Sequence, residues 1–254
     1  MISEGEYVLL YSEKGDKWLI KIRKDGVFST DLGIIQHNDI IEKSFGEYVL
    51  THKNRKIWII KPSIYDYILK TRRRTQIIYP KDIGYIIMKL GVKPDSKILE
   101  IGTGSGALTT GLAWILEKDG LIDTYEKRSE FLDLAKENIS RINPKASINF
   151  HNEDAIESTF KKEFYDIAFL DIDSPWLIID KVYEALKPSG RIGILLPTYN
   201  QVDKVLPSLE KRFIDIEGAE IFKRELQLKH GKIRPLFRMI GFTAILITGI
   251  KIIY

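Results

Sequence analysis

A glycine-rich turn between a buried strand and a helix constrains this chain more than any other feature. Residues 97–101 (KILEI) are apolar enough for a strand that is buried on both faces, and Gly102-Thr-Gly-Ser-Gly-Ala107 follows directly. Glycine has no Cβ, so the backbone can turn sharply there and can approach a ligand closely. A turn of this kind, where a strand passes into a helix, is typical of α/β folds with a mainly parallel sheet.

The rest of the chain after residue 97 alternates between strand-like and helix-like patterns. The expected strands are 97–101, 121–125, 146–150, 166–170, 191–196 and 242–253, and the expected helices are 107–117, 129–139, 177–186 and 200–212. Strands that alternate with helices along the chain favour a doubly wound sheet with right-handed crossovers. We therefore expect one Rossmann-like α/β domain over residues 95–254.

The first 62 residues have a different pattern and predict a small N-terminal β domain. Short runs rich in aromatic and β-branched residues are separated by Gly, Asp and Asn, which is typical of a small barrel or curled sheet. The expected strands are 7–11, 18–22, 46–50 and 57–60. Residues 63–94 are expected to be a connector, in which Ser63 caps a helix over 64–69 and Asp82 caps a helix over 83–90.

Composition excludes several classes of site. The chain has no cysteine, so disulfides, thiolate nucleophiles and cysteine-bound metals are excluded, and its four histidines lack the spacing of metal ligands. We expect no metal. The apolar run 239–250 is too short to span a membrane, and the first residues lack the basic and apolar parts of a signal peptide. A cytoplasmic protein without a membrane partner is the expectation.

Basic residues are concentrated in two stretches, although the net charge is only +4. Arg72, Arg73 and Arg74 are consecutive, and residues 223–238 hold six cations, including Arg234 and Arg238, with Glu225 as the only acid. Arginine and lysine bind phosphates without reading sequence, so these stretches are candidates for RNA binding. The alternative for either stretch alone is a solvated protein surface.

Acidic residues stand at or near the ends of three successive expected strands. Glu100 lies two residues before the first glycine, where it would favour a cationic ligand and repel a pyrophosphate. Glu126 can accept from both ribose hydroxyls, and Asp154 from an adenine amino group. Together they favour S-adenosylmethionine over NAD, although Gly102, Gly104 and Ala107 also satisfy the dinucleotide pattern. A glycine turn without a cofactor, and acids that merely cap helices, are the alternatives.

The fourth strand of the series ends in Leu170-Asp-Ile-Asp-Ser-Pro-Trp176, which supplies candidate catalytic groups. Ligands of α/β folds lie at the carboxyl ends of the strands. A carboxylate there suits methylation of a ring nitrogen such as adenine N1, whose lone pair is already free. Asp171 could accept from the neighbouring N6 amino group and stabilise the charge that develops on the base. The alternative for Asp171 is an acid that only ends the strand, and Trp176 could either stack on a base or pack on the sheet.

Four stretches resemble the tRNA (adenine-N1)-methyltransferase family, in its archaeal and bacterial form, within the class I methyltransferase superfamily. They are the segment 73–82 (RRTQIIYPKD), the glycine loop 100–109 (EIGTGSGALT), the strand end 170–176 (LDIDSPW) and the C-terminal segment 234–243 (RPLFRMIGFT). Residues 33–41 are similar to the small β domain of that family. One departure is Phe242, where the family has histidine before the threonine.

The resemblance implies a seven-stranded sheet with an antiparallel last strand, and methyl transfer from S-adenosylmethionine to N1 of adenine 58 in the T loop of tRNA. It leaves open whether adenine 57 is a second position. It implies that Asp171 is the catalytic acid and that the arginine triplet, Arg234 and Arg238 contact RNA. It also implies a homotetramer. The residues that it assigns to the cofactor are Gln76, Tyr79, Glu100, Gly102, Gly104, Ser105, Gly106, Ala107, Leu108, Glu126, Asp154 and Asp171.

Three other functions stay open on the sequence alone. One is a methyltransferase that acts on another RNA, a protein or a small molecule, which would leave the arginine run without a role. Another is a tRNA-binding subunit without catalysis, which would be expected to lose the glycine loop or Asp171. The last is an NAD-dependent oxidoreductase, which cofactor binding would distinguish at once.

Overall fold

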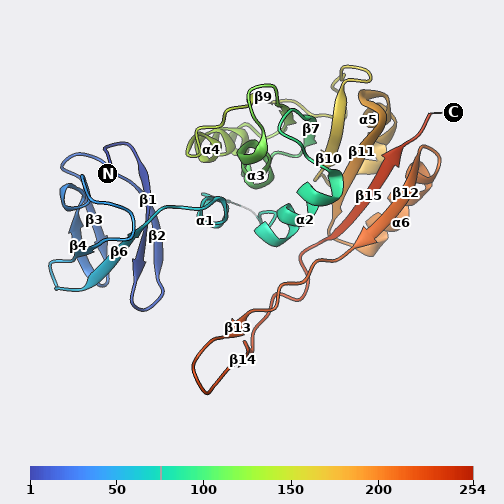
Figure 1. Ribbon diagram of the computed structural model, residues 1–254. Helices are drawn as coiled ribbons and strands as arrows, with labels where there is room; N and C mark the ends of the chain where they lie inside the picture. The colour runs from blue at the N-terminus through green and yellow to red at the C-terminus, as the bar shows by residue number, and fades with distance from the viewer. Residues whose placement is uncertain (75, 254) are drawn as a thin grey trace. The chain divides into compact units, whose positions relative to one another are not determined.

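The computed structural model describes residues 1–74 and 76–253 (Figure 1). Thr75, in the expected connector, and Tyr254, the last residue of the expected second domain, lie outside the described residues. The chain divides into two compact units, Met1–Thr71 and Arg72–Tyr254. The expected connector of residues 63–94 is therefore divided between them.

The first unit contains a four-stranded antiparallel sheet in the order β2-β1-β6-β5, and a separate β3-β4 hairpin. Its strands are β1 (Tyr7–Ser12), β2 (Lys17–Lys21), β3 (Val27–Thr30), β4 (Gly33–Gln36), β5 (Tyr48–Leu50) and β6 (Lys56–Ile60), with a 3-10 helix at His37–Asp39. Val8 and Leu10 alternate with Tyr7 and Tyr11 along β1, so one face of the sheet forms the core. The four expected strands are confirmed, whereas β3 and β4 are too short for their alternation to predict them.

Helix α1 (Ile64–Leu69) completes the first unit and begins as the sequence predicts. The Ser63 hydroxyl accepts from the Asp66 amide, and the Asp66 carboxylate accepts from the Ser63 amide. This reciprocal capping box satisfies two amide groups that would otherwise have no partner at the helix start.

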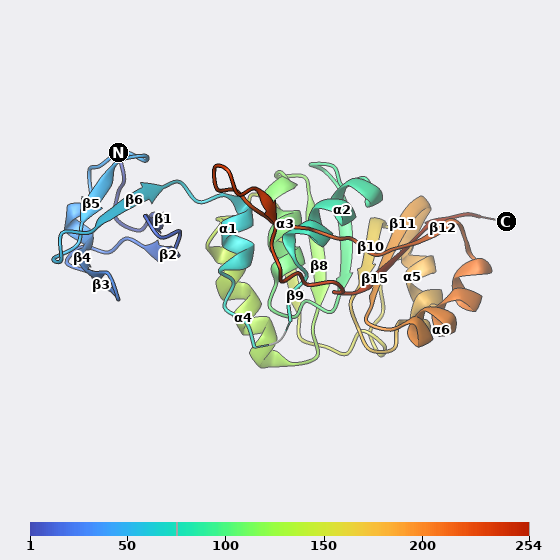
Figure 2. The same cartoon turned by 90° about the horizontal axis from the view of Figure 1, so that it is seen from below.

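The second unit is a seven-stranded sheet in the order β12-β15-β11-β10-β7-β8-β9, with helices on both faces (Figures 1 and 2). β15 runs antiparallel to both neighbours, and the other neighbouring strands pair in parallel. The strands are β7 (Lys97–Ile101), β8 (Leu121–Tyr125), β9 (Ser147–His151), β10 (Tyr165–Leu170), β11 (Leu186–Leu196), β12 (Phe213–Ala219) and β15 (Ile245–Lys251). This is the predicted Rossmann-like class I methyltransferase architecture, including the antiparallel last strand.

Alternating side chains of β11 show how the helices cover the sheet. Ile192 and Ile194 lie in the core with α5 and α6, while a Cβ on Gly193 would lie 3.0 Å from Leu90 of α2, on the other face. The helices are α2 (Pro80–Leu90), α3 (Ala107–Ile115), α4 (Ser129–Ser140), α5 (Ile179–Ala185) and α6 (Tyr199–Glu210), with a 3-10 helix at Pro175–Leu177. A parallel sheet that is covered on both faces explains the continuous apolar runs of its central strands.

The start of α2 differs from the expectation. The helix begins at Pro80 with Tyr79 as its N-cap residue, so Asp82 is not the cap. Asp82 is buried, and its carboxylate accepts from the Lys81 ammonium at 2.7 Å. Lys81 also donates to the Ile221 carbonyl and the Thr243 hydroxyl. The prediction that Asp82 caps this helix is wrong for two reasons. The ion pair with Lys81 holds Asp82 inside the first turn, and the fixed φ angle of Pro80 suits the first helical position.

Residues 220–244 form a long extension between β12 and β15, which we call the arm (Figure 1). Two short strands, β13 (Leu226–Gln227) and β14 (Arg234–Pro235), pair near its end. The predicted strand over 242–253 is confirmed only over Ile245–Lys251, because residues 242–244 belong to the base of the arm and the strand ends before residue 252. Neither β12 nor the hairpin of the arm is predicted from the sequence pattern.

Candidate active site

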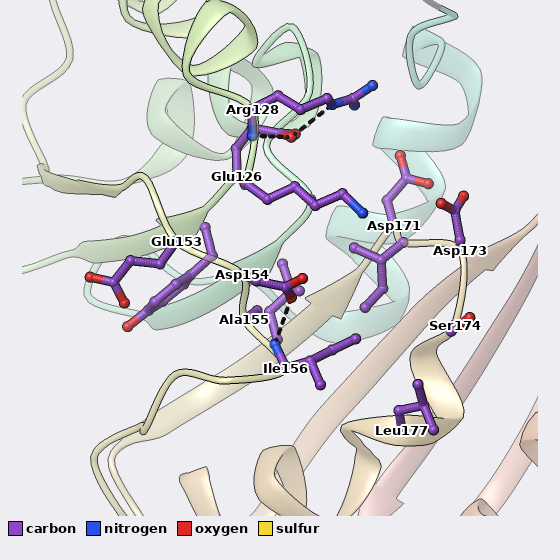
Figure 3. Close-up of a pocket in the computed structure, with 15 residues that line it drawn as sticks. Glu126, Arg128, Glu153, Asp154, Ala155, Ile156, Asp171, Asp173, Ser174 and Leu177 are labelled. Atoms are coloured by element: carbon purple, nitrogen blue, oxygen red, sulfur yellow. Dashed lines mark hydrogen bonds and ion pairs between the residues drawn. The ribbon is translucent and has the colours of Figure 1, made fainter.

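The carboxyl ends of β7, β8 and β10, together with the segment after β9, surround a cavity of about 310 Å³. Parallel neighbours in one sheet bring residues from distant parts of the sequence to this edge. The lining residues are Ile101, Gly102, Tyr125, Glu126, Lys127, Arg128, Glu153, Asp154, Ala155, Ile156, Asp171, Ile172, Asp173, Ser174 and Leu177. Four of the predicted site residues, Gly102, Glu126, Asp154 and Asp171, therefore lie around one cavity (Figure 3).

Three glycines of the turn have positive φ angles but different surroundings. A Cβ on Gly102, at φ +94°, would lie 2.1 Å from the Asp171 carbonyl oxygen, so only glycine fits between β7 and the strand end that carries Asp171. Gly104, at φ +53°, has no heavy atom within 4 Å of such a Cβ. Gly106, at φ +76°, lies against Ala135 of α4. Two of these glycines permit close packing, and Gly104 leaves open space.

The remaining loop residues lie at the start of α3 and do not line the cavity. Ala107 and Leu108 are buried in the first turn, and Ser105 is also buried. The Ser105 hydroxyl makes no hydrogen bond within the described part of the chain. These side chains support the loop, and its backbone is the part available to a ligand.

Glu100 is buried next to the glycine turn and does not line the cavity. Its Oε2 accepts from the hydroxyls of Thr109 and Thr124, each at 2.7 Å. Burial raises the pKa of Glu100 to about 7, against the opposing effect of these hydrogen bonds. The carboxyl group of Glu100 therefore connects β7 to β8 and α3 within the core of the domain. Its direct contact with a cofactor stays a prediction.

Glu126 lies at the end of β8 with both carboxylate oxygens engaged. One oxygen accepts from the Gly104 amide at 3.1 Å, and the other from the amide and Nε of Arg128, each at 3.1 Å. The Arg128 guanidinium stacks over the Phe131 ring, 3.8 Å from its centroid. Glu126 is thus held in place between the glycine turn and α4, at the position where a ribose is expected.

Asp154 follows β9, where its Oδ1 accepts from the Ile156 amide at 3.0 Å. Tyr125, which also lines the cavity, stacks on His151 with ring centroids 4.3 Å apart and an interplanar angle of 10°. The Tyr165 hydroxyl donates to the buried Asp123 carboxylate beneath these rings. Tyr125 is therefore an aromatic lining residue of the cavity that is supported by packing against His151.

Asp171 and Asp173 lie on the loop after β10, across the cavity from Glu126 and Arg128 (Figure 3). The Asp171 amide donates to the Ile101 carbonyl at 2.8 Å, which fixes the strand end against β7. The pKa of Asp171 is raised to about 6, first because the surrounding protein displaces water and then because of the Asp173 and Glu126 carboxylates. Asp171 is consequently an ionised carboxylate at neutral pH that responds to charge placed in the cavity.

Two predicted cofactor residues precede α2 and lie outside the lining set. The Tyr79 hydroxyl donates to Oε1 of Gln76 at 3.4 Å. Neither residue lines the cavity, so the predicted border role of this pair stays a prediction.

The predicted RNA-binding arginines occupy two exposed segments. The backbone amide and carbonyl of Arg72 bond to the side-chain amide of Asn138, which also donates to the Ser105 carbonyl at 2.9 Å. The arginine triplet is therefore attached to the glycine loop through Asn138. Arg234 and Arg238 lie on the arm, where Arg234 stacks over Phe237 at 4.0 Å.

Within residues 1–74 and 76–253, no group of three or more potential protein ligands could hold a metal ion. The same residues contain no helix with the length and hydrophobicity that a membrane crossing requires.

Comparisons with known proteins identify the family. The family described as the tRNA methyltransferase complex GCD14 subunit matches residues 55–239, and the TrmI-like N-terminal family matches residues 1–49. A curated relative from Methanocaldococcus jannaschii, the tRNA (adenine(57)-N(1)/adenine(58)-N(1))-methyltransferase TrmI, is 33% identical over 93% of this chain and 92% of its own. The chain belongs to this tRNA (adenine-N1)-methyltransferase family.

Two solved structures that are similar over the whole chain have the same fold, which agrees with membership of this family. The tRNA (m1A58) methyltransferase TrmI from Aquifex aeolicus matches with a TM-score of 0.87 and 33% identity, over 100% of this chain and 99% of the other. A Thermotoga maritima protein described as a SAM-dependent O-methyltransferase matches with a TM-score of 0.93 and 37% identity, over 100% and 95%. The two relatives share one architecture, although their descriptions name different acceptor atoms.

Sequence reasoning missed residues of this site whose role is visible only in three dimensions. Arg128 and Asn138 hold Glu126 and the glycine loop, and Glu153 lines the cavity beside Asp154. Arg128 follows Glu126 by two residues, and this proximity was an available signal. Asn138 lies in the helix pattern of α4 and carries no such signal. Trp176, for which the sequence left two roles open, is half-buried and packs against the core of the sheet.

Proposed function

We propose that this chain transfers a methyl group from S-adenosylmethionine to N1 of adenine 58 in the T loop of tRNA, with adenine 57 as a second position. The Methanocaldococcus relative is named for both positions, and the Aquifex structure for position 58. The observation that carries the proposal is the placement of Asp171, which lies at the carboxyl edge of the sheet, in the same cavity as Gly102, Glu126 and Asp154.

The residues around the cavity fit S-adenosylmethionine. Glu126 is held where it can accept from ribose hydroxyls, and Asp154 where it can accept from an adenine amino group. The cavity is lined by five acidic side chains and by only two cationic ones, Lys127 and Arg128. This excess of negative charge suits a cationic ligand better than a pyrophosphate. When bound there, the cofactor would supply a methyl group on a positively charged sulfur.

Asp171 provides the group that this chain contributes to the chemistry. Adenine N1 carries a free lone pair, so no base has to remove a proton before the methyl group is transferred. The ionised Asp171 accepts a hydrogen bond from the N6 amino group and orients the ring. Positive charge then develops on the base, and a nearby carboxylate stabilises it more strongly in the transition state than in the ground state.

The substrate adenine has to leave the stacked T loop to reach a cavity of this kind. We assign phosphate contacts to exposed cations of the second unit, in the arginine triplet and on the arm, including Arg234 and Arg238. Such contacts recognise the shape of the folded RNA more than its sequence. We place the enzyme in the cytoplasm, together with its tRNA substrate.

We also propose a homotetramer in which the arm contributes the contact between copies. Nine of its residues are large, hydrophobic and exposed: Phe222, Leu226, Leu228, Ile233, Leu236, Phe237, Met239, Ile240 and Phe242. A concentration of apolar side chains on an extension is typical of a surface that a partner covers. Phe242, which replaces the expected histidine, is one of them.

The second candidate is transfer to an oxygen atom, which the description of the Thermotoga structure favours. A hydroxyl acceptor has to lose a proton, which would require a general base close to the sulfur. Asp171, whose pKa is raised to about 6, could serve that role as well as the proposed one. The atom that receives the methyl group distinguishes the two functions.

Labelled methyl transfer to unmodified tRNA transcripts tests the proposal, with nucleoside mapping of the product. The expected product is 1-methyladenosine in the T loop. Replacement of adenine 58 by guanine in the transcript should remove most of the label, and replacement of adenine 57 only part of it. A 2′-O-methylated nucleoside, or cofactor binding without label in tRNA, would contradict the proposal.

A further inference from the structure

The four-stranded sheet of the first unit has a second face that its core does not use. Side chains alternate across a strand, so the residues between the core positions point to this opposite face. We call it the outer face. It consists of Lys17, Leu19 and Lys21 on β2, Tyr7, Leu9 and Tyr11 on β1, Lys56, Trp58 and Ile60 on β6, and Tyr48 and Leu50 on β5.

Helix α1 covers one end of the outer face. Tyr67 of α1 packs edge-on against Tyr7, with ring centroids 6.0 Å apart. Leu9, the next outer residue along β1, is only 3% exposed although it points away from the core cluster. This end of the face is therefore closed by the protein itself.

The other end is open and carries a row of aromatic rings. Strand register places Tyr11 opposite Trp58, and Trp58 opposite Tyr48, so three rings lie in line across β1, β6 and β5. We call these three residues the aromatic row. Tyr48 is 45% exposed and its neighbour Leu50 is 48% exposed on the edge strand. Rings that only served the core would not be arranged at the solvent side of a sheet.

Lysines accompany the aromatic row. Lys17 stands opposite Tyr11 in the register, with its ammonium 5.8 Å from the centre of that ring. The Lys56 ammonium lies 4.6 Å from the centre of the Tyr48 ring. The outer face carries three lysines and no acid in its strands, whereas the net charge of residues 1–71, with 11 basic and 10 acidic side chains, is only +1. The positive charge is thus concentrated beside the rings.

We propose that the open end of the outer face binds unpaired nucleotides of the RNA substrate. Bases stack on the aromatic row, and Lys17 and Lys56 contact the adjoining phosphates. Aromatic rings tolerate any base because every base has a π face, and the lysines match the charge of the backbone. The inference rests on the proposed function, because it takes the substrate to be tRNA. It adds a binding surface on the first unit that is made by different residues from the cavity.

Binding measurements on the full chain test the aromatic row directly. Trp58→Ala removes the central ring, and Trp58→Phe keeps an aromatic ring in its place. Trp114→Ala, at a residue that is 50% exposed on α3, is the matched control. We expect Trp58→Ala to weaken binding of an unmodified tRNA transcript about 10-fold, since each stacked base contributes about 1–3 kcal/mol. Trp58→Phe and the control should stay within about twofold of the wild type.

The lysines have a separate signature in salt dependence. A Lys17→Gln and Lys56→Gln double variant should lower the slope of log affinity against log salt by about 1.5. The control double variant, Lys24→Gln and Lys118→Gln, should leave that slope unchanged. A 12-nucleotide oligouridine should compete with tRNA for the wild type more strongly than a 12-base-pair RNA duplex does.

Methyl transfer at saturating tRNA and sedimentation of each variant separate the outcomes. Weakened binding with an unchanged maximal rate supports the proposal. Wild-type binding by Trp58→Ala and by the lysine variant overturns it and leaves the proposed function intact. A change of oligomeric state in these variants also overturns it, because the face would then be an interface between copies. Failure of the wild-type chain to bind or methylate tRNA overturns the proposed function and this inference together.

Discussion

The carboxyl edge of the seven-stranded sheet and the arm are built in opposite ways. At the sheet edge, a Cβ on Gly102 would meet the Asp171 backbone at 2.1 Å, and Glu100 is fully enclosed with two hydroxyl donors. On the arm, Phe237 is 88% exposed and Leu228 is 80% exposed. The first region is densely packed within one chain, whereas the second presents apolar surface that one chain leaves uncovered.

This difference separates chemistry from assembly. Binding and catalysis require groups held in fixed positions, which dense packing and hydrogen bonds at the sheet edge provide. Association requires exposed apolar surface, which the arm provides without affecting that packing. The base of the arm is nevertheless fixed, because Lys81 bonds to Ile221 on one side and Thr243 on the other. Substitutions in the two regions should therefore alter different measurements.

The largest effect is expected for Gly102→Ala. The added Cβ would meet the Asp171 carbonyl at a distance that real Cβ atoms do not show, and φ is +94°. Backbone strain and overpacking of about 1–3 kcal/mol each should lower the free energy of unfolding by about 4 kcal/mol. Urea denaturation measures this change, and a loss below about 1 kcal/mol would contradict the packing described here.

Gly104→Ala is the matched control at the same turn. Open space surrounds the position, so the expected loss of stability is only about 1–2 kcal/mol, from the positive φ angle. The new methyl group enters space that we assign to the cofactor. Calorimetry should therefore show weaker binding of S-adenosylmethionine by a variant that remains folded.

The next effect concerns the buried carboxyl group of Glu100. Its pKa is about 7 in the folded chain, above its ordinary value of 4.5. The folded state therefore favours the protonated form, and stability falls as pH rises from about 4.5 through 7. Glu100→Gln keeps an acceptor for Thr109 and Thr124 but does not ionise. The free energy of unfolding of this variant, relative to wild type, should increase by about 3 kcal/mol between pH 4.5 and 8.

The control for that measurement is the variant itself at low pH, where both side chains are neutral. A difference between the two proteins that stays constant with pH would show that folding does not shift the pKa of Glu100.

The smallest effect on folding is expected on the arm. A Leu228→Ser and Phe237→Ser double variant removes two exposed side chains, so cofactor affinity and the unfolding of each subunit should change by less than about 0.5 kcal/mol. Sedimentation should instead show smaller species than the tetramer that we propose for the wild type. Met88→Ser, at a residue that is 80% exposed on α2, should keep the assembly intact. A double variant that remains a tetramer would show that the arm is not the contact.

Local patterns made the fold and much of the cavity predictable. The apolar runs of β7, β8 and β10 are long and buried, and the acids Glu126, Asp154 and Asp171 stand at or just after strand ends that a parallel sheet brings together. The order of strands in such a sheet follows from its topology. That these three acids lie around one cavity could therefore be predicted without knowledge of side-chain contacts.

Long-range pairing accounts for what the sequence did not predict. Asp82 resembles a helix cap, but the neighbouring Lys81 pairs with it while reaching Ile221 and Thr243 about 140–160 positions away along the chain. β12 has exposed and half-buried positions at an edge of the sheet, so its apolar pattern is weak. Asn138 has a role only because α4 places it between Arg72 and Ser105.

The most direct test of the account is single-turnover methyl transfer to tRNA by the wild type and by Asp171→Asn, at saturating cofactor and across pH 5 to 8. The wild-type rate should rise as Asp171 ionises, with a midpoint near pH 6, and reach a plateau. Asp171→Asn should still bind S-adenosylmethionine, but it should react about 100- to 1000-fold more slowly and lack this pH dependence. A variant that methylates tRNA at the wild-type rate with the same pH profile would contradict the central role of Asp171.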